Sequence, residues 1–217
     1  MMKDKRCLLL ALIIILACET APKINKETTL PFFNSAEFTP EWISEAAKDY
    51  ENIHTIPDFK FVNQNGKSVS NNDYIGKIYI ADFFFTSCPG ICPRLAKNMG
   101  KLQEAFKEDD DVLLLSHSVT PVKDSVPVLK EYAIENNVDS EKWNLVTGDK
   151  NAIYKLARNA YFADEDFVKT QDESAFIHTE NFILIDKKGR IRGVYNGTLA
   201  IETDRIIRHI KLLKKEG

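Results

Sequence analysis

The sequence predicts an α/β fold in which a mixed central sheet is flanked by helices. Two apolar runs, residues 77–85 and 111–116, are continuous rather than alternating, as expected for strands covered on both faces. A segment with the apolar spacing of an amphipathic helix follows each run. Near the carboxyl end, two more strand-like runs flank residues 186–189, Asp-Lys-Lys-Gly, a turn typical of a hairpin. Parallel strands joined through helices, then a late antiparallel hairpin, make up the predicted sheet.

The remaining elements follow in chain order. Residues 59–62 and 67–69 flank an Asn-Gln-Asn-Gly segment, which predicts an added N-terminal hairpin. A short strand is expected over residues 143–147, and the late hairpin is formed by residues 179–185 and 190–195. The apolar spacing predicts helices over residues 93–106, 125–136, around 153–157 and 201–213. This order of elements is typical of a thioredoxin-like domain.

Composition places the chain among ordinary globular proteins. It has 217 residues, of which 44% are hydrophobic and 28% charged, enough for one domain with a sizeable core. The formal net charge is −3, and no basic stripe interleaved with aromatic residues is present. These features argue against a nucleic-acid partner.

The amino-terminal segment differs from the rest of the chain. Lys3, Lys5 and Arg6 precede about ten apolar residues that end at Cys18, too few to span a membrane but enough for a signal-peptide core. Residues 15–18, Ile-Leu-Ala-Cys, resemble a bacterial lipobox, in which the cysteine is acylated. We therefore expect a lipoprotein signal peptide over residues 1–17, and a protein exported to the bacterial cell envelope and anchored to a membrane by lipidated Cys18. A plain membrane anchor and an ordinary secretory signal are the alternatives.

Residues 18–50 are expected to link this anchor to the domain. The first part, to about residue 35, is polar and lacks periodicity, which predicts a flexible tether. Thr39 as N-cap and Pro40 at the first helical position then predict a short helix over residues 41–48 that docks onto the main body. The thioredoxin-like domain itself is expected over residues 51–217.

Cysteine usage indicates chemistry rather than structural cross-linking. Of four cysteines, Cys7 leaves with the signal peptide and Cys18 carries lipid, so only Cys88 and Cys92 remain in the folded part. A disulfide enclosing three residues would constrain the unfolded chain little. The pair is therefore expected to exchange electrons or to bind a metal.

The position of the pair supports this expectation. It follows a buried strand and precedes a helix, with Cys92 as the expected N-cap, Pro93 at the first helical position and Gly90 relieving steric demands in the loop. Unpaired N–H groups and the helix dipole favour thiolates there. Three residues separate the cysteines, where a thioredoxin-type motif has two. The longer loop loosens the geometry for thiol exchange and leaves room for both sulfurs to reach one metal ion.

A third metal ligand is sought among four histidines. His209 lies on an amphipathic helix and is expected at the surface, His54 is expected to be a solvated loop residue, and His117 a packed residue near a strand end. His178 follows a polar stretch, residues 169–174, that reads as an exposed loop able to fold over the cysteines, so it is the preferred ligand. Two thiolates and one imidazole suit Cu(I), and Cu(II) with an added oxygen ligand. Zinc would require a fourth ligand, which the sequence does not offer.

A longer pattern surrounds the cysteines. It consists of residues 83–93, Phe-Phe-Phe-Thr-Ser-Cys-Pro-Gly-Ile-Cys-Pro, and continues through residues 118–124, 129–133, 143–148 and His178. On these residues the chain resembles, from about residue 52 to 213, the SCO/SenC family of copper-binding, thioredoxin-fold proteins. The resemblance implies Cys88, Cys92 and His178 as copper ligands. It also implies delivery of copper to, or reduction of the cysteines of, the binuclear copper site of cytochrome c oxidase.

The chain departs from the family pattern at two positions. Thr120 stands where the family often has Asp, and Ile177 stands where Asp often precedes the histidine. Both changes bear on copper affinity, because outer hydrogen bonds orient ligating groups. His117 and Glu180 lie near these positions in the sequence and are candidates to compensate.

Other functions compete with copper delivery by a metallochaperone. A thiol:disulfide oxidoreductase would use Cys88 as attacking thiolate and Cys92 as resolving thiol, without metal, and reduction of a partner is compatible with metal transfer. A peroxidase-like thioredoxin relative would need a polar network activating one cysteine, for which only Thr86 is a candidate. A binding module with an inert, oxidised pair is the remaining alternative.

Overall fold

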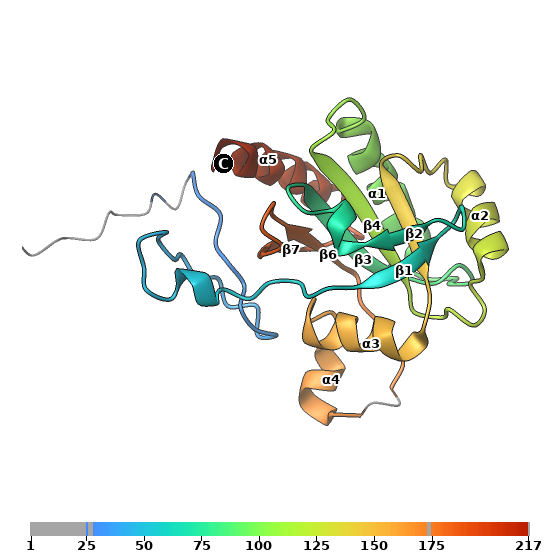
Figure 1. Ribbon diagram of the computed structural model, residues 1–217. Coiled ribbons are helices and arrows are strands. Elements are labelled where there is room, and N and C mark those ends of the chain that lie inside the picture. Colours follow the sequence, from blue (N-terminus) through green and yellow to red (C-terminus); the bar gives the residue numbers. More distant parts are fainter. Residues whose placement is uncertain (1–24, 26–27, 173–174, 217) are drawn as a thin grey trace, which may run out of the picture.

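The computed structural model describes residues 25, 28–172 and 175–216 (Figure 1). The predicted signal peptide and Cys18 lie outside the described residues, as do residues 19–24, 26 and 27 of the predicted tether. Within the described ranges, no helix is both long enough and apolar enough to cross a membrane.

A single seven-stranded mixed sheet organises the domain, in the order β2-β1-β5-β4-β3-β6-β7. The pairs β3–β4 and β4–β5 are parallel, whereas β1–β2, β1–β5, β3–β6 and β6–β7 are antiparallel. The strands are β1 (Lys60–Asn63), β2 (Ser68–Ser70), β3 (Ile78–Phe84), β4 (Val112–Ser118), β5 (Trp143–Thr147), β6 (Asn181–Ile185) and β7 (Ile191–Asn196). The predicted mixed sheet, with its N-terminal and late hairpins, is therefore present.

Helices cover both faces of this sheet, with α1 and α5 on the side opposite α3 and α4 in Figure 1. The helices are α1 (Cys92–Ala105), α2 (Val126–Glu135), α3 (Lys150–Asn159), α4 (Glu165–Thr170) and α5 (Ala200–Glu216), with 3-10 turns η1 (Tyr50–Asn52) and η2 (Asn71–Asp73). Central strand β3 is buried at every position. Its Ile78, Ile80 and Phe84 join the core beneath α1, α2 and α5, and Tyr79, Ala81 and Phe83 join the core beneath α3. Burial on both sides is the physical reason for the continuous apolar run.

The prediction of a helix over residues 41–48 is wrong, because the chain is not helical there. Glu41 instead forms an isolated antiparallel bridge with Phe32, whose N–H donates to the Glu41 carbonyl at 2.8 Å and whose carbonyl accepts from the Glu41 N–H at 2.9 Å. These bonds hold the backbone extended at the point where the helix was expected to start. The capping pattern Thr-Pro was therefore overridden by pairing with a residue nine positions earlier in the chain.

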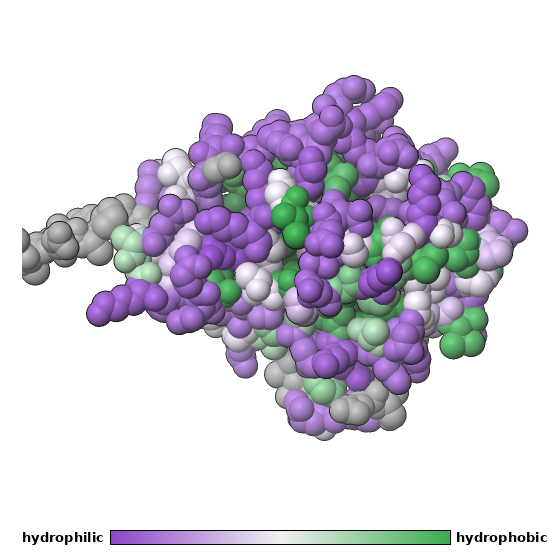
Figure 2. All heavy atoms as spheres, in the orientation of Figure 1, coloured by the Kyte–Doolittle hydropathy of each residue, from purple (hydrophilic) through white to green (hydrophobic). Residues whose placement is uncertain are grey.

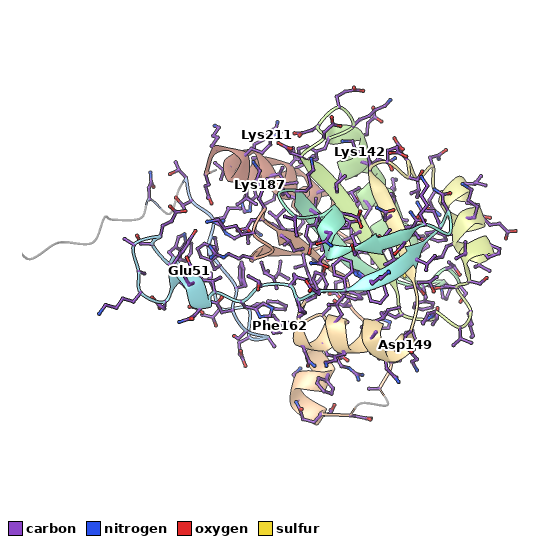
Figure 3. All side chains as sticks on the ribbon, in the orientation of Figure 1. Glu51, Lys142, Asp149, Phe162, Lys187 and Lys211 are labelled. Atoms are coloured by element: carbon purple, nitrogen blue, oxygen red, sulfur yellow. The ribbon has the colours of Figure 1, made fainter. Side chains whose placement is uncertain are left out.

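The same N-terminal segment packs against the turn between α3 and α4. Phe38 contacts the ring of Phe162 at a centroid separation of 6.3 Å, and both residues have positive φ, 48° and 52°. The ring of His54 also packs on Phe162, at a centroid separation of 4.6 Å. Figure 3 shows Phe162 between this segment and the end of α3.

Part of the stretch predicted as an exposed loop is helical. Asp164 caps α4 by accepting the N–H of Phe167 at 3.1 Å, and the helix ends at Gln171, which is left-handed with φ 54°. Lys169 and Thr170, expected in the loop, therefore belong to the last turn of α4.

Candidate metal and redox centre

Strand β3 and helix α1 place the two cysteines at one edge of the sheet. The chain leaves β3 at Phe84, and the Cys88 N–H donates to the Phe85 carbonyl at 3.3 Å. Helix α1 then begins with Cys92 itself, one residue earlier than predicted. The N-cap is therefore Ile91 and not Cys92, and Pro93 is the second helical residue and not the first. A Cβ on Gly90 would lie 4.0 Å from the Cys88 sulfur, an ordinary contact, so space alone does not require glycine there.

The Cys88 thiol is acidic for a cysteine. Partial burial opposes ionisation, but hydrogen bonds from the Cys92 N–H, the Cys92 thiol and the N–H groups of Gly90 and Ile91 outweigh it and lower the pKa of Cys88. Cys88 is half-buried and free of a disulfide. It is therefore the sulfur that is both accessible and ready to act as a thiolate.

Cys92 behaves in the opposite way. Burial is the main reason why the pKa of the Cys92 thiol is raised to about 12; the hydrogen bond with the Phe85 backbone lowers the pKa, while the nearby Cys88 and Asp82 contribute to raising it. Its side chain is buried, with 4% exposure, in the core beneath α1. The neutral Cys92 thiol donates toward the Cys88 sulfur and stabilises that thiolate.

His178 lies at the same place, although it comes 86 positions after Cys92 in the sequence. A small pocket is lined by both cysteines and His178, together with Phe83, Phe85, Ile91, Val119, Ile177 and Thr179. Ile177 and Thr179 are buried on either side of His178, whose own side chain is exposed. The buried neighbours fix the backbone there while the imidazole stays at the surface.

The family model for SCO1/SenC matches residues 47–215 of this chain. The SCO1 protein homolog of Bacillus subtilis is 34% identical over 166 residues, which cover 76% of this chain and 84% of that protein. The chain belongs to the SCO1/SenC family.

Solved structures of SCO1/SenC members have the same fold. A structure of BsSco, described as a member of the Sco family of cytochrome c oxidase assembly proteins with a disulfide switch, aligns with a TM-score of 0.64 at 30% identity, covering 75% of this chain and 95% of that one. Arabidopsis thaliana ScoI with copper bound aligns with a TM-score of 0.55 at 25% identity, covering 71% and 97%. The thioredoxin-like fold predicted for this chain is thereby confirmed.

The donor atoms of this SCO1/SenC chain suit copper, but they are not closed around a metal position. Two sulfurs and an imidazole are soft, low-coordinate ligands of the kind that Cu(I) accepts. Among the described residues, however, no group of three or more His, Cys, Asp or Glu side chains is arranged to hold a metal ion. Binding therefore requires the exposed His178 side chain to turn toward the sulfurs.

The other histidines are engaged elsewhere. His54 is not a solvated loop residue, because its Nε2 donates to the Ala160 carbonyl at 2.8 Å and its ring packs on Phe162. His209 is half-buried and hydrogen-bonded to the Tyr195 hydroxyl at 2.8 Å, not simply at the surface. His117 is packed as expected: it is fully buried among Phe59, Phe61, Phe83 and Tyr161, and burial lowers its pKa to about 3. In the described part of the chain, neither His117 nor Glu180 lines the cysteine pocket.

A buried carboxyl group beneath the cysteines was not assigned a role from the sequence. Asp82 of β3 is 2% exposed, and its Oδ1 has no hydrogen-bond partner among the described residues. Burial raises the pKa of Asp82 to about 7 against a hydrogen bond from Ser116, which in turn accepts from Trp143 Nε1 at 2.8 Å. The one signal in the sequence is a charged residue inside a continuous apolar strand.

Arg158 of α3 connects the helical layer to the segment that carries His178. Its Nε donates to Asp164 at 2.8 Å, and its Nη2 donates to the Ala175 carbonyl at 2.7 Å, three residues before His178. The guanidinium also lies 4.5 Å from the ring centroid of Phe167 in α4. One buried cation therefore holds both α4 and the start of the His178 segment.

Proposed function

We propose that this SCO1/SenC protein carries copper on Cys88, Cys92 and His178, and delivers it to the binuclear copper site of cytochrome c oxidase or reduces the cysteines of that site. The observation that supports this proposal is the shared pocket: both sulfurs and the imidazole line it, although they come from two distant parts of the chain. Copper is the cargo in this account, and the protein supplies soft ligands that can also release it.

The proposed ligands have separate tasks. The Cys88 thiolate is the accessible sulfur and meets the incoming ion first. Cys92 must lose its proton to ligate, and because its pKa is about 12 this step depends on the charge of the bound metal. His178 closes the site from the solvent side, since its side chain is exposed at the rim of the pocket.

Attachment to a membrane belongs to the same proposal. Lipidated Cys18 would hold the domain at the surface of a bacterial membrane, and the residues that follow would let the cysteine edge reach a membrane-bound partner. In the view of Figure 2 the domain is covered largely by hydrophilic residues with smaller hydrophobic patches between them, which fits a domain held in water next to a membrane.

Anaerobic titration of the reduced protein with Cu(I) tests the proposal. We expect about one copper per wild-type chain after gel filtration. In His178→Ala we expect a loss of affinity of at least roughly 10- to 100-fold, because losing even a residue that only orients a metal ligand typically costs this much, and His178 is proposed as a ligand itself. His209→Ala is the matched control, since His209 is bound to Tyr195 and not to the pocket. Equal affinities of wild type and His178→Ala would refute the three-ligand site.

A second candidate function is thiol:disulfide exchange, and the difference in acidity between the two cysteines favours it. The Cys88 thiolate attacks a partner disulfide, forming a mixed disulfide and releasing one partner thiolate. The Cys92 sulfur, after losing its proton, then attacks Cys88 and releases the second partner thiolate, so the partner gains two electrons and this pair becomes a disulfide. In this reading His178→Ala retains full reductase activity, whereas either Cys→Ser abolishes it.

A further inference from the structure

Asp124 lies in the turn between β4 and α2 and gathers an unusual number of hydrogen bonds. Its Oδ1 accepts from the Thr86 hydroxyl at 2.6 Å, and its Oδ2 accepts from the Thr86 N–H at 3.3 Å, from the Ser118 hydroxyl at 2.6 Å and from the Thr120 hydroxyl at 2.9 Å. The side chain is 1% exposed. Within the described ranges it forms no ion pair. Hydrogen bonds alone therefore stabilise this buried carboxylate.

The three donors come from segments that meet at the cysteine edge. Thr86 lies two residues before Cys88, where the chain has left β3; Ser118 ends β4; and Thr120 opens the turn after it. The end of β3 is also tied to β4 by the Val119 N–H, which donates to the Phe84 carbonyl at 2.9 Å. Asp124 thus extends the pairing of two parallel strands into the loop that carries the reactive sulfur.

Thr120 is part of the same cluster. Thr120 donates through its hydroxyl, whereas a carboxylate at this position would bring a second negative charge against Asp124 without a proton to share. Its N–H donates to the Ser118 hydroxyl oxygen at 3.1 Å, which frees the Ser118 proton for Asp124. The residue at position 120 therefore supports Asp124 directly.

We propose that Asp124 is a positioning residue for the cysteine pair, and that its two hydrogen bonds with Thr86 stabilise the dithiol form over the disulfide. Both cysteines are free in this structure, and the two Thr86 bonds to Asp124 belong to this reduced arrangement of the loop. A disulfide requires the two sulfurs to approach to about 2.05 Å, a movement of the Cys88 segment that these bonds oppose. Fixing the chain at Thr86 therefore favours the reduced pair selectively.

The thiol–disulfide equilibrium of the metal-free protein with glutathione tests this inference. Glutathione disulfide takes two electrons from the pair, one intramolecular S–S bond forms, and two glutathione thiols are released. In Thr86→Val we expect the disulfide to be favoured about tenfold more than in wild type, equivalent to a reduction potential lower by about 30 mV. Thr86→Ser keeps the hydroxyl and should restore the wild-type constant.

Two control variants separate positioning from general loosening. Ser118→Ala removes one donor to Asp124 but leaves both Thr86 bonds in place, and Thr203→Val removes a buried hydroxyl in α5 that has no partner among the described residues. Both should keep the wild-type equilibrium within about twofold. The inference is overturned if Thr86→Val has the wild-type equilibrium constant. It is also overturned if Ser118→Ala shifts that constant as far as Thr86→Val does. Asp124→Asn, where it folds, should shift at least as far as Thr86→Val, and a folded variant with the wild-type constant also overturns it.

The inference rests on the proposed function only for the exchange step, and the assay contains no copper. A protein that cycles between dithiol and disulfide but binds no copper refutes copper delivery and leaves the role of Asp124 intact. A copper-binding protein in which Thr86→Val changes nothing refutes the role of Asp124 alone.

Discussion

Cys88 and Cys92 differ in exposure and acidity although only three residues separate them. The Cys88 sulfur faces the N–H groups of the first turn of α1, whereas the Cys92 thiol is buried under that turn. The helix terminus therefore acts on one sulfur and the apolar core on the other. If the pair acts in thiol exchange, as the second candidate function proposes, this difference gives each cysteine one step.

Alkylation and trapping measure the difference directly. We expect iodoacetamide at neutral pH to modify Cys88 at least roughly tenfold faster than Cys92, because the thiolate is the reactive form. Cys92→Ser should accumulate a mixed disulfide with glutathione, while Cys88→Ser should not. Mass spectrometry resolves both results, with urea-unfolded protein as the control in which the two cysteines react alike. Faster modification of Cys92 would contradict the assignment.

Asp82 makes stability depend on pH. Its pKa is about 7 in the folded chain against an ordinary value of 3.8, so between these values the folded protein keeps a proton that the unfolded chain has lost. Stability is therefore lost as pH rises from about 4 through 7. Asp82→Asn should remove this loss and raise the free energy of unfolding at pH 8 by on the order of 3 kcal/mol, with a much smaller change at pH 4.

Urea unfolding of the reduced protein at the two pH values checks this expectation. Exposed Asp204→Asn in α5 is the matched control and should leave the difference between the two pH values unchanged. An Asp82→Asn variant that is less stable than wild type at pH 8 would contradict this expectation, because it would mean that the fold stabilises the ionised Asp82 carboxylate.

At the scale of elements, α3, α4 and the His178 segment are held together by Arg158. Its ion pair with Asp164 is buried at both ends, with side-chain exposures of 6% and 4%. Arg158→Met leaves the Asp164 carboxylate without its cation, and we expect a loss of roughly 3–5 kcal/mol in the free energy of unfolding. Hydrogen exchange should accelerate over residues 164–172 and 175–178 before it does in the sheet.

The double variant Arg158→Met, Asp164→Leu removes the unpaired charge and should recover part of the stability. It should not recover the slow exchange near Ala175, whose carbonyl has lost its donor. Unchanged exchange there in both variants would mean that Arg158 does not hold this segment.

Elements with an unambiguous local pattern could be predicted from the sequence. The continuous apolar runs predicted strands β3 and β4, and the amphipathic spacing predicted helices α1 and α5. The candidate ligands were predicted from the Cys-x-x-x-Cys loop and from the position of His178 late in the chain. Residues 41–48 were predicted wrongly because the bridge between Phe32 and Glu41 overrides good local capping.

The rest depended on contacts between distant segments. In β3 every side chain is buried, so alternation could not tell which face Asp82 occupies or that it lies beneath the cysteines. In the sequence, Asp124 and Arg158 look like ordinary charged residues. Only folding brings Thr86 to Asp124 and Ala175 to Arg158. Helix α4 is six residues long and too short for a periodic signal.

For the whole molecule, Arg192 joins the N-terminal segment to the domain. Its guanidinium donates to the Leu30 and Pro31 carbonyls and to Glu216 near the end of α5, and it lies 4.2 Å from the Phe32 ring centroid. Arg192→Met should cost roughly 2–3 kcal/mol and make the region around residues 28–34 sensitive to protease. Copper stoichiometry should stay at the wild-type value, because none of these residues lines the cysteine pocket. Loss of copper binding would show that the two regions are coupled.

The proposed function requires that side chains from two distant segments bind one copper ion. X-ray absorption spectroscopy of the Cu(I)-loaded, reduced protein can detect this, because sulfur and imidazole ligands scatter differently. We expect two sulfur ligands and one imidazole in wild type, and loss of the imidazole contribution in His178→Ala with both sulfurs retained. A wild-type spectrum without imidazole, or an unchanged spectrum in His178→Ala, would contradict the proposed function.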